Sequence, residues 1–230
     1  MMEKDISNYF QKFHSDLCFD NLHTMYPTTM KSFVGTKSVS LRNQVSTFYG
    51  FVYEGTYQLR YNDKITTTLV ANSFFSCPGN CTLEPAGENC KAFVIERHGY
   101  RGLFQVGVVE EPDGRLCYID NASTTILIPP PRLGDPVLNY LAFPPNVIQT
   151  THIHPTIRLG LAFAGEGECV LGDGKKIPLT PGTLFCLPER MVHSFNSFAE
   201  GLKIIAFHPD SDVGPTDSSH PMLSRTYKVE

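Results

Sequence analysis

The stretch THIHPTIRLG, residues 151–160, places two histidines one residue apart and an arginine shortly after them. On a strand, side chains alternate between the two faces, so His152 and His154 point the same way. Two neutral imidazoles on one face can ligate a divalent metal ion. Arg158 follows closely but cannot ligate, because a guanidinium is always charged and has no acceptor. The stretch therefore predicts half of a metal site with a cation beside it.

Plainer interpretations of the same residues stay open. A single strand histidine is more often a hydrogen-bonded core or surface residue than a ligand. Arg158 could also turn outward into solvent, since a shift of one residue reverses the face of a strand. The acidic segment HPDSDVGPTDSSHPM follows residue 207 and is either a turn-rich cover loop or part of a site. The residues that could line a site, besides those above, are His208, Asp210, Asp212 and Cys186.

Composition limits the classes of partner. Of 230 residues, 41% are hydrophobic and 18% charged, with 18 Gly and 17 Pro, which is typical of a turn-rich globular protein. A net charge of −4 without Lys/Arg runs disfavours nucleic acid, and no apolar run is long enough to span a membrane. We therefore expect a small-molecule ligand. Seven cysteines behind a start that lacks a signal-peptide pattern predict reduced thiols and a cytoplasmic location.

The element pattern changes character early in the chain. Residues 4–20 have apolar side chains at three- and four-residue steps, which predicts a short N-terminal helix. The apolar positions are Ile6, Tyr9, Phe10, Phe13 and Leu17. Beyond them, short β-rich runs such as STFYGFVYEG and KAFVIER alternate with Gly, Pro, Asn and Asp. These runs predict an all-β protein.

An internal repeat is visible when the sequence is shifted by 110 residues. The shift places FVYEG (51–55) on LAFAG (161–165) and His98 on His208. Further matches fall on turn glycines and core positions: Gly50 with Gly160, Gly55 with Gly165, Phe75 with Phe185, and Pro78 with Pro188. We interpret the two halves as the same fold twice.

The repeat also shows a difference between the halves. The same shift aligns His152, His154 and His193 with Arg42, Gln44 and Leu83. Side chains of those three kinds cannot form a site of three imidazoles. The sequence thus predicts a metal site in the second half alone.

The second half resembles the cupin superfamily, whose first motif is Gly, five residues, His-x-His, three or four residues, Glu, six residues, Gly. The stretch NVIQTTHIHPTIRLGLAFAG matches it at His152, His154 and Gly165. Asn146 stands in place of the first glycine, and Arg158 stands in place of the glutamate.

The second cupin motif is Gly, five residues, Pro-x-Gly, two residues, His, three residues, Asn. The stretch GTLFCLPERMVHSFN matches it at Gly182, Pro188 and His193. Arg190 replaces the middle glycine, and Asn196 comes one residue early. The joint spacing of three histidines, two glycines and a proline is much more specific than a lone His-x-His.

The resemblance implies a small antiparallel β-barrel of the double-stranded β-helix or jelly-roll kind, here duplicated as a bicupin. The expected organisation is an N-terminal helical segment (1–30), a degenerate cupin barrel (31–98), connecting strands (99–137), a metal-binding cupin barrel (138–208) and a C-terminal cover segment (209–230).

The resemblance also implies that His152, His154 and His193 hold one divalent metal ion, with Fe(II) or Zn(II) favoured over Ni, Mn or Cu. Cupin iron sites with three histidines and no glutamate are similar to those of thiol and diketone dioxygenases. In such a site, Arg158 could hold a substrate carboxylate or phosphate bidentately.

Two classes of function follow. The first is a metal-dependent enzyme, a dioxygenase, isomerase or lyase, acting on a small anionic metabolite that is amino-acid-like or carboxylate-like. The second is a non-catalytic bicupin that binds or senses a small ligand. A fainter resemblance, carried by His-x-His-Pro, Arg158 and the tail HPDSDVGPTDSSHPM, is to cupin components of bacterial pathways that form hydrazines from amino acids. The catalytic residue stays unassigned, and a homodimer is a candidate assembly.

Overall fold

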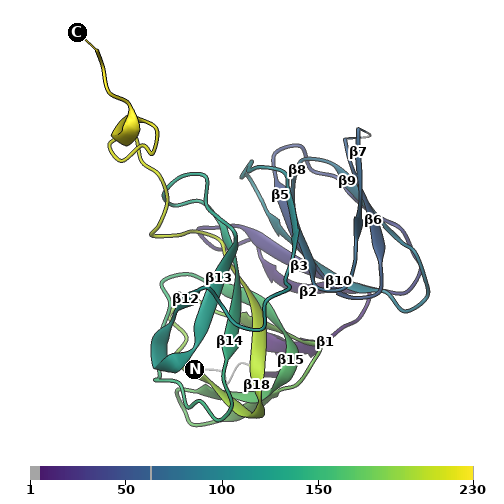
Figure 1. Cartoon of the computed structure of the whole chain (residues 1–230). Coiled ribbons are helices and arrows are strands. Elements are labelled where there is room, and N and C mark those ends of the chain that lie inside the picture. The colour runs from purple at the N-terminus through teal and green to yellow at the C-terminus, as the bar shows by residue number, and fades with distance from the viewer. Residues whose placement is uncertain (1–5, 63, 230) are drawn as a thin grey trace.

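The computed structural model describes residues 6–62 and 64–229, and the fold of these residues is all-β, as predicted (Figure 1). The described helices are three short 3₁₀ turns. They are η1 (Ile6–Tyr9), η2 (Ile119–Asn121) and η3 (Leu223–Arg225). In these described ranges, no helix has the length and apolarity needed to cross a membrane.

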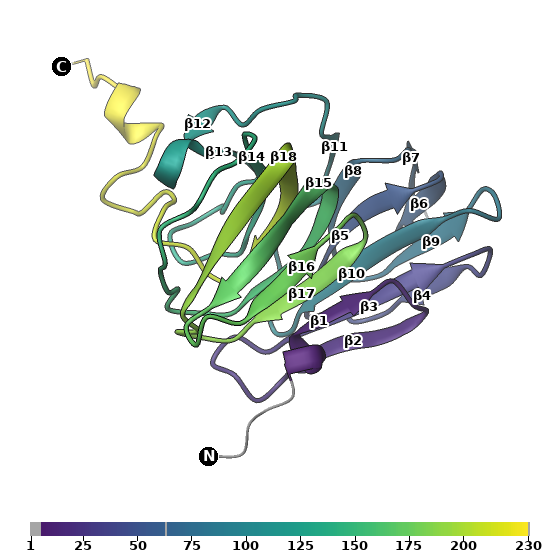
Figure 2. The ribbon, with the colours of Figure 1, turned by 90° about the horizontal axis from the view of Figure 1, so that it is seen from below.

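The helix predicted over residues 4–20 is wrong, and its first two residues lie outside the described ones. After η1 the chain forms β1 (Phe10–Lys12) and β2 (Asp16–Asn21). β1 pairs antiparallel with β17 (Thr183–Leu187) of the second half, whereas β2 pairs with β3 (Thr28–Val34) of the first (Figure 2). The apolar residues thus serve two different sheets. Tertiary pairing overrides a helical pattern that is too short to be stable alone.

The first barrel consists of two facing sheets. One has the strand order β11-β8-β5-β10-β3-β2, and the other β4-β9-β6-β7. The strands not yet given are β4 (Val39–Leu41), β5 (Thr47–Glu54), β6 (Tyr57–Tyr61), β7 (Ile65–Leu69), β8 (Ser73–Pro78), β9 (Cys81–Pro85), β10 (Lys91–Arg97) and β11 (Gln105–Val108). An apolar core fills the interior, with Phe48, Tyr57, Phe75 and Leu83 at 0–2% exposure.

The second barrel is built from one sheet of eight strands in the order β1-β17-β15-β18-β14-β13-β12, with β16 paired to β15. Its remaining strands are β12 (Leu116–Cys117), β13 (Ser123–Ile128), β14 (Val137–Phe143), β15 (Arg158–Leu171), β16 (Lys176–Leu179) and β18 (His193–His208). The register of β15 against β18 shifts twice, at Ala162/Ala164 and Gly165/Gly167. Such bulges bend a strand, which lets one sheet curve around an interior.

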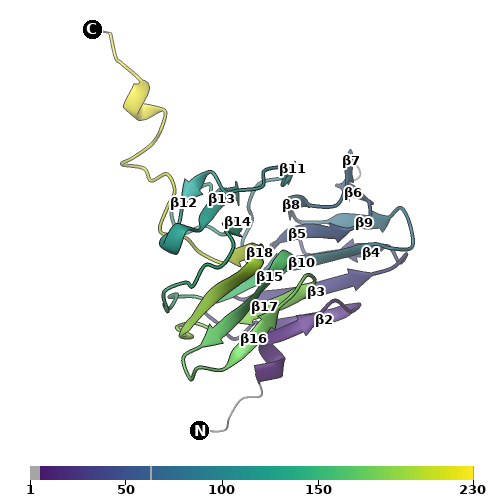
Figure 3. The ribbon, with the colours of Figure 1, turned by 60° about the horizontal axis from the view of Figure 1, so that its bottom comes forward.

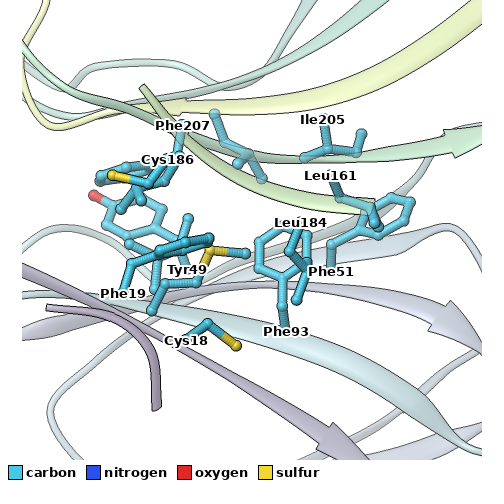
Figure 4. Close-up of a cluster of buried hydrophobic side chains, with 14 of the residues drawn as sticks. Cys18, Phe19, Tyr49, Phe51, Phe93, Leu161, Leu184, Cys186, Ile205 and Phe207 are labelled. Atoms are coloured by element: carbon cyan, nitrogen blue, oxygen red, sulfur yellow. The ribbon is translucent and has the colours of Figure 1, made fainter. Parts of the chain in front are cut away.

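A shared apolar cluster joins the two barrels (Figure 4). The Tyr49 ring of the first half lies 4.9 Å from the Phe207 ring of the second, and Phe51 lies 5.3 Å from Phe163. Burying one side chain of this size stabilises the fold by about 1.5–3 kcal/mol. The cluster therefore holds the barrels against each other as one packed unit.

The strand registers relate the halves through the predicted offset over part of their length. Gly50 pairs with Phe75, and Gly160 pairs with Phe185. A Cβ on either glycine would come within 2.2–2.5 Å of the ring opposite. Each phenyl ring thus covers a glycine, and any larger residue at that position would displace the ring.

The last strands of the two halves, β10 and β18, keep that offset against one neighbouring strand and depart from it against the other. Gly50 also pairs with Val94, but Gly160 pairs with Ala206, which is 112 residues later. Against β3 and β14 the offset is kept: His98 N–H donates to Pro27 O, and His208 pairs with Val137, which is 110 residues after Pro27. His98 and His208 are therefore equivalent in register on that side of the strands. The two halves thus differ by a two-residue shift in the pairing of β10 with β5 and of β18 with β15. That the halves arose by duplication stays a prediction.

The C-terminal segment covers less than expected. Residues near its start are held to the loop before β14, where Leu133 N–H donates to Pro215 O and Gly134 N–H to Ser211 O, both at 3.0 Å. Beyond residue 215 the chain is largely exposed and extends away from both barrels (Figures 1 and 3). Only residues up to about 215 contribute to the walls near the site.

Candidate metal centre

The three histidines of the expected site come together in the second barrel. His152 lies in the loop before β15, and His193 is the first residue of β18. The two form an antiparallel bridge in which each N–H donates to the other's carbonyl oxygen, at 2.9 and 3.0 Å. The carbonyl oxygen of His154 accepts the N–H of Arg190 at 2.8 Å. These bonds fix the backbone that carries all three rings.

The rings face one another. Their centroids are 4.9 Å apart for His152 and His154, 4.6 Å for His152 and His193, and 5.2 Å for His154 and His193. One ring nitrogen from each lies within 4.8 Å of the others. The group could therefore hold one metal ion, which zinc and iron sites commonly bind through imidazole nitrogen.

Backbone carbonyls set the tautomer of two of these ligands. The Nδ1 of His152 lies 2.8 Å from Thr150 O, and the Nδ1 of His193 lies 2.8 Å from Met191 O. Because a carbonyl only accepts, Nδ1 carries the proton and Nε2 keeps its lone pair. The His193 Nε2 atom is buried and has no partner among the described residues. This is the donor set that a metal ion requires.

Burial keeps the rings of His154 and His193 neutral. Burial lowers the pKa of His154 to about 3, with further lowering by Arg158 and the neighbouring histidines. Burial likewise lowers the pKa of His193 to about 4. Protons therefore do not compete for these nitrogens near pH 7, where a metal ligand must be unprotonated.

The histidines open onto a cavity of about 210 Å³. A water molecule takes up about 30 Å³ of liquid, so the space equals roughly seven waters and suits a small ligand. Its walls are mainly apolar and include Tyr118, Ile126, Leu141, Phe185, Leu187 and Phe195. Tyr118 and Ile126 belong to the segment expected to be connecting strands (99–137), so that segment also forms a wall of the second barrel.

Arg158 lines the same cavity and is 8% exposed. Its Nη1 donates to Thr156 O at 3.0 Å, Thr156 Oγ1 at 2.7 Å and Ile157 O at 3.0 Å. Its Nε is buried without a partner among the described residues. Burial lowers the pKa of Arg158 to about 10, partly offset by Asp210, so the guanidinium stays charged at pH 7.

His208 lines this cavity beside Arg158 but stands apart from the metal-binding group. Its ring centroid is 6.3 Å from that of His154, and Asn139 Nδ2 lies 3.4 Å from its Nε2. Burial holds the pKa of His208 well below its ordinary value. It is a neutral wall residue that faces the space next to the metal ligands.

The two aspartates lie in an adjoining recess of about 270 Å³ that shares Arg158 and His208 with the main cavity. Asp210 Oδ1 accepts the hydroxyl of Thr156 at 2.5 Å, and that hydroxyl in turn accepts from Arg158. Asp210 thus orients the arginine indirectly, through the Thr156 hydroxyl. Asp212 lines the recess and contributes a weaker attraction to the guanidinium.

Cys186 does not line the cavity, and its expected place there is wrong. On β17 the side chains alternate, so Phe185 and Leu187 face the cavity while Cys186 faces the cluster between the barrels. Its thiol lies 3.6 Å from Asn21 Nδ2, and burial raises its pKa to about 12. A buried thiol of this kind is inert.

The two positions where the motif glycines are missing keep the glycine conformation. Asn146 has φ of 59° and Arg190 has φ of 57°, both in the left-handed region. Asparagine tolerates this region, whereas a long side chain is strained there. The loops that carry the histidines thus retain the motif's backbone with other side chains.

Gln149 is the cavity residue that sequence reasoning missed. It lies three positions before His152, is 3% exposed, and has a buried Nε2 without a partner among the described residues. Five such unpartnered side-chain atoms occur in the described ranges, and three belong to Gln149, Arg158 and His193. Only its polar character beside the His-x-His pair could have drawn attention to it.

No family model and no curated protein matches this sequence. Solved structures do match. A cupin 2 conserved barrel domain protein from Leptotrichia buccalis is 17% identical with a TM-score of 0.61, covering 82% of this chain and 86% of that one. Protein Ylba from E. coli is 13% identical with a TM-score of 0.66, covering 94% and 89%.

A salicylate 1,2-dioxygenase from Pseudaminobacter salicylatoxidans is 9% identical with a TM-score of 0.58, covering 80% of this chain and 71% of that one. At these identities, the likeness establishes the fold. The chain has the cupin fold, and its second barrel carries a three-histidine group that could hold a metal ion.

Proposed function

We propose that this protein is a metal-dependent enzyme that acts on a small carboxylate-like metabolite, with oxygenase-type chemistry. One observation carries the proposal: three convergent imidazoles and a buried guanidinium line the same small cavity. Among the described residues that line it, none is acidic. Such a cavity is suited to an anion.

Fe(II) or Zn(II) fits the donor set best. His152, His154 and His193 would hold the ion through neutral imidazoles, and such an ion would supply Lewis acidity and, for iron, redox chemistry with oxygen. The carbonyls of Thr150 and Met191 hold two of the ligands in the required tautomer. Arg158 stands where the cupin motif has a glutamate. A glutamate would ligate the metal ion, whereas the arginine can pair with a negatively charged group of the substrate.

Arg158 is the residue that we assign to the substrate carboxylate. Its Nη1 is committed to three oxygens of Thr156 and Ile157, so the edge formed by Nε and Nη2 is available to a ligand. That edge matches the two oxygens of a carboxylate. The apolar walls exclude water and strengthen the pairing.

A second candidate substrate is amino-acid-like, and the adjoining recess favours it. Asp210 and Asp212 line that recess next to Arg158, so a ligand with its carboxylate on Arg158 could direct an ammonium group toward them. Asp212→Asn should then weaken the binding of an amino acid but not of the matching acid without an amine.

The test is binding of small carboxylates to the zinc-loaded protein, followed by oxygen uptake with Fe(II). The salicylate dioxygenase among the structural neighbours supports including aromatic acids. Arg158→Ala should weaken binding about ten- to a hundredfold, since charge-assisted hydrogen bonds contribute roughly 1.5–3 kcal/mol each. Arg158→Lys should restore little, because an ammonium lacks the planar fork.

The matched control is Arg42→Ala in the first barrel, which should bind as the wild type does. Normal binding by Arg158→Ala would refute the clamp. Binding without oxygen uptake or product would favour the non-catalytic alternative, a ligand-binding or sensing protein.

A further inference from the structure

Gln149 is tied to the strand that carries His193. Its backbone N–H donates to Asn196 Oδ1 at 3.2 Å, and its side-chain Oε1 accepts the Phe195 N–H at 2.9 Å. Both partners belong to the first residues of β18, close to the metal ligand at position 193. The side chain therefore spans from its loop to the wall of the cavity.

These bonds settle which way the amide points. A backbone N–H can only donate, so the atom opposite Phe195 N must be the amide oxygen and not the nitrogen. The Nε2 donor is therefore not used in the pairing with that strand. It is buried and has no partner among the described residues. Burying an amide donor without an acceptor is unfavourable, and native proteins rarely leave one so.

Gln149 and Arg158 approach the cavity from different walls. Arg158 lies at the start of β15, beside the last residues of β18, whereas Gln149 is bound to the first residues of β18. Both line the same cavity as the three histidines. A ligand whose carboxylate lies on the guanidinium would therefore present a different atom to the amide.

We infer that Gln149 Nε2 donates a hydrogen bond to an oxygen acceptor of the substrate that is separate from its carboxylate, and so determines specificity. The inference rests on the proposed function. It defines the substrate as a small acid with an apolar body and a second oxygen, a hydroxyl or carbonyl group. A site built to pair with an oxygen discriminates strongly against the analogue that lacks it, because the donor is then left unpaired.

The experiment uses the full chain loaded with Zn(II), which has no redox chemistry and so permits binding without oxidation. The probes are benzoate and the ortho, meta and para hydroxybenzoates, which share a carboxylate and a flat ring and differ by one oxygen. Affinities are measured by calorimetry. At least one hydroxybenzoate should bind the wild type about tenfold more tightly than benzoate does.

Two variants test the amide. Gln149→Glu keeps an oxygen for the Phe195 N–H and removes the donor, whereas Gln149→Met removes both at similar length. The readout is the ratio of the benzoate and hydroxybenzoate dissociation constants, since added charge or lost stability affects both acids alike. The ratio should fall to about one in both variants and stay near ten in the control Gln58→Met of the first barrel.

A ratio that stays near ten in either Gln149 variant, or that is near one in the wild type, overturns the inference. If benzoate still binds in that case and Arg158→Ala weakens it, the proposed function stands without this role for Gln149. If the wild type binds none of these acids, the proposed function and the inference fail together.

Discussion

The two barrels have similar strand pairing but different interiors, a filled core in the first and a cavity in the second. Phe48 of the first barrel pairs with Cys77, and Arg158 of the second pairs with Leu187. Both residues of the second pair are 110 positions after those of the first. Phe48 is 2% exposed within an apolar core. Arg158 is also buried, but it borders a cavity lined by histidines. At equivalent register positions, a phenyl ring lies in a filled core and a guanidinium borders a cavity.

The comparison distinguishes the residues that both barrels need for their fold from those that form a ligand site in the second. Both barrels keep a glycine covered by a phenyl ring, Gly50 with Phe75 and Gly160 with Phe185. The first barrel has no comparable group of ligands in the described residues. Its core is filled and it packs against the second barrel, whereas in the second barrel the residues with an unpartnered buried atom, Gln149, Arg158 and His193, line a cavity.

Exchanging the two side chains should have the largest effect. Phe48→Arg buries a cation where no partner or cavity receives it, and an uncompensated buried charge costs roughly 3–5 kcal/mol. For a chain of this size, about 1 kcal/mol shifts the melting temperature by roughly 2–4 °C. We expect a loss of about 6–20 °C by differential scanning calorimetry, with Phe48→Leu as the milder control.

The reverse exchange sharpens the comparison. Arg158→Phe should fold with a melting temperature close to that of the wild type and lose carboxylate binding, because the cavity can accept an apolar ring. If Arg158→Phe were as unstable as Phe48→Arg, the guanidinium would be a structural element of the barrel and not a ligand group.

Acidification should destabilise the metal-free protein through the same interior. The pKa values of His154 and His193 lie at about 3 and 4 in the folded state, below the ordinary value of 6.5. Between about pH 6.5 and 4 the unfolded chain thus binds more protons, and stability falls as pH falls, by at most about 1.4 kcal/mol per pH unit for each histidine. Thermal unfolding with a chelator present should show this slope, and His154→Gln should reduce it.

A slope that is the same in His154→Gln and the wild type would mean that other groups cause the acid sensitivity.

The smallest expected effect concerns the replaced motif glycines. Arg190→Gly should raise the melting temperature by roughly 2–4 °C. A residue with a Cβ is disfavoured in the left-handed region by about 1 kcal/mol, and glycine removes this strain from the folded state. Asn146→Gly should change it less, since asparagine tolerates this conformation. Arg190 lies next to the site, so metal content serves as the control, and it should not change. A lower melting temperature for Arg190→Gly would show that its side chain contributes more than its backbone costs.

The sequence carried the local signals of this fold well. Alternating runs predicted the strands, and strand period placed His152 and His154 on one face. The resemblance of the second half to the two cupin motifs implied that His193 joins them. The N-terminal helix was wrong because residues 10–21 are shared between two sheets, and such pairing is a long-range property. The two-residue shift between β15 and β18 could not be predicted either, since a register is set by both partner strands together.

The cavity shows the same limit. Arg158 was expected to face either the site or solvent, and only packing places it inside. Gln149 was missed because its meaning depends on Phe195, which lies 46 residues away. Cys186 was misplaced because the face of β17 that meets the cavity is decided by the other barrel.

Metal stoichiometry tests whether one metal ion binds to each chain, in the second barrel and not in the first. The protein is purified without a chelating tag, loaded with Fe(II) under nitrogen or with Zn(II), and dialysed. The metal content per chain is then measured by elemental mass spectrometry. We expect one ion per chain in the wild type and in Gln44→Ala, and none in His154→Ala. Two ions per chain in the wild type, or full metal content in His154→Ala, would contradict it.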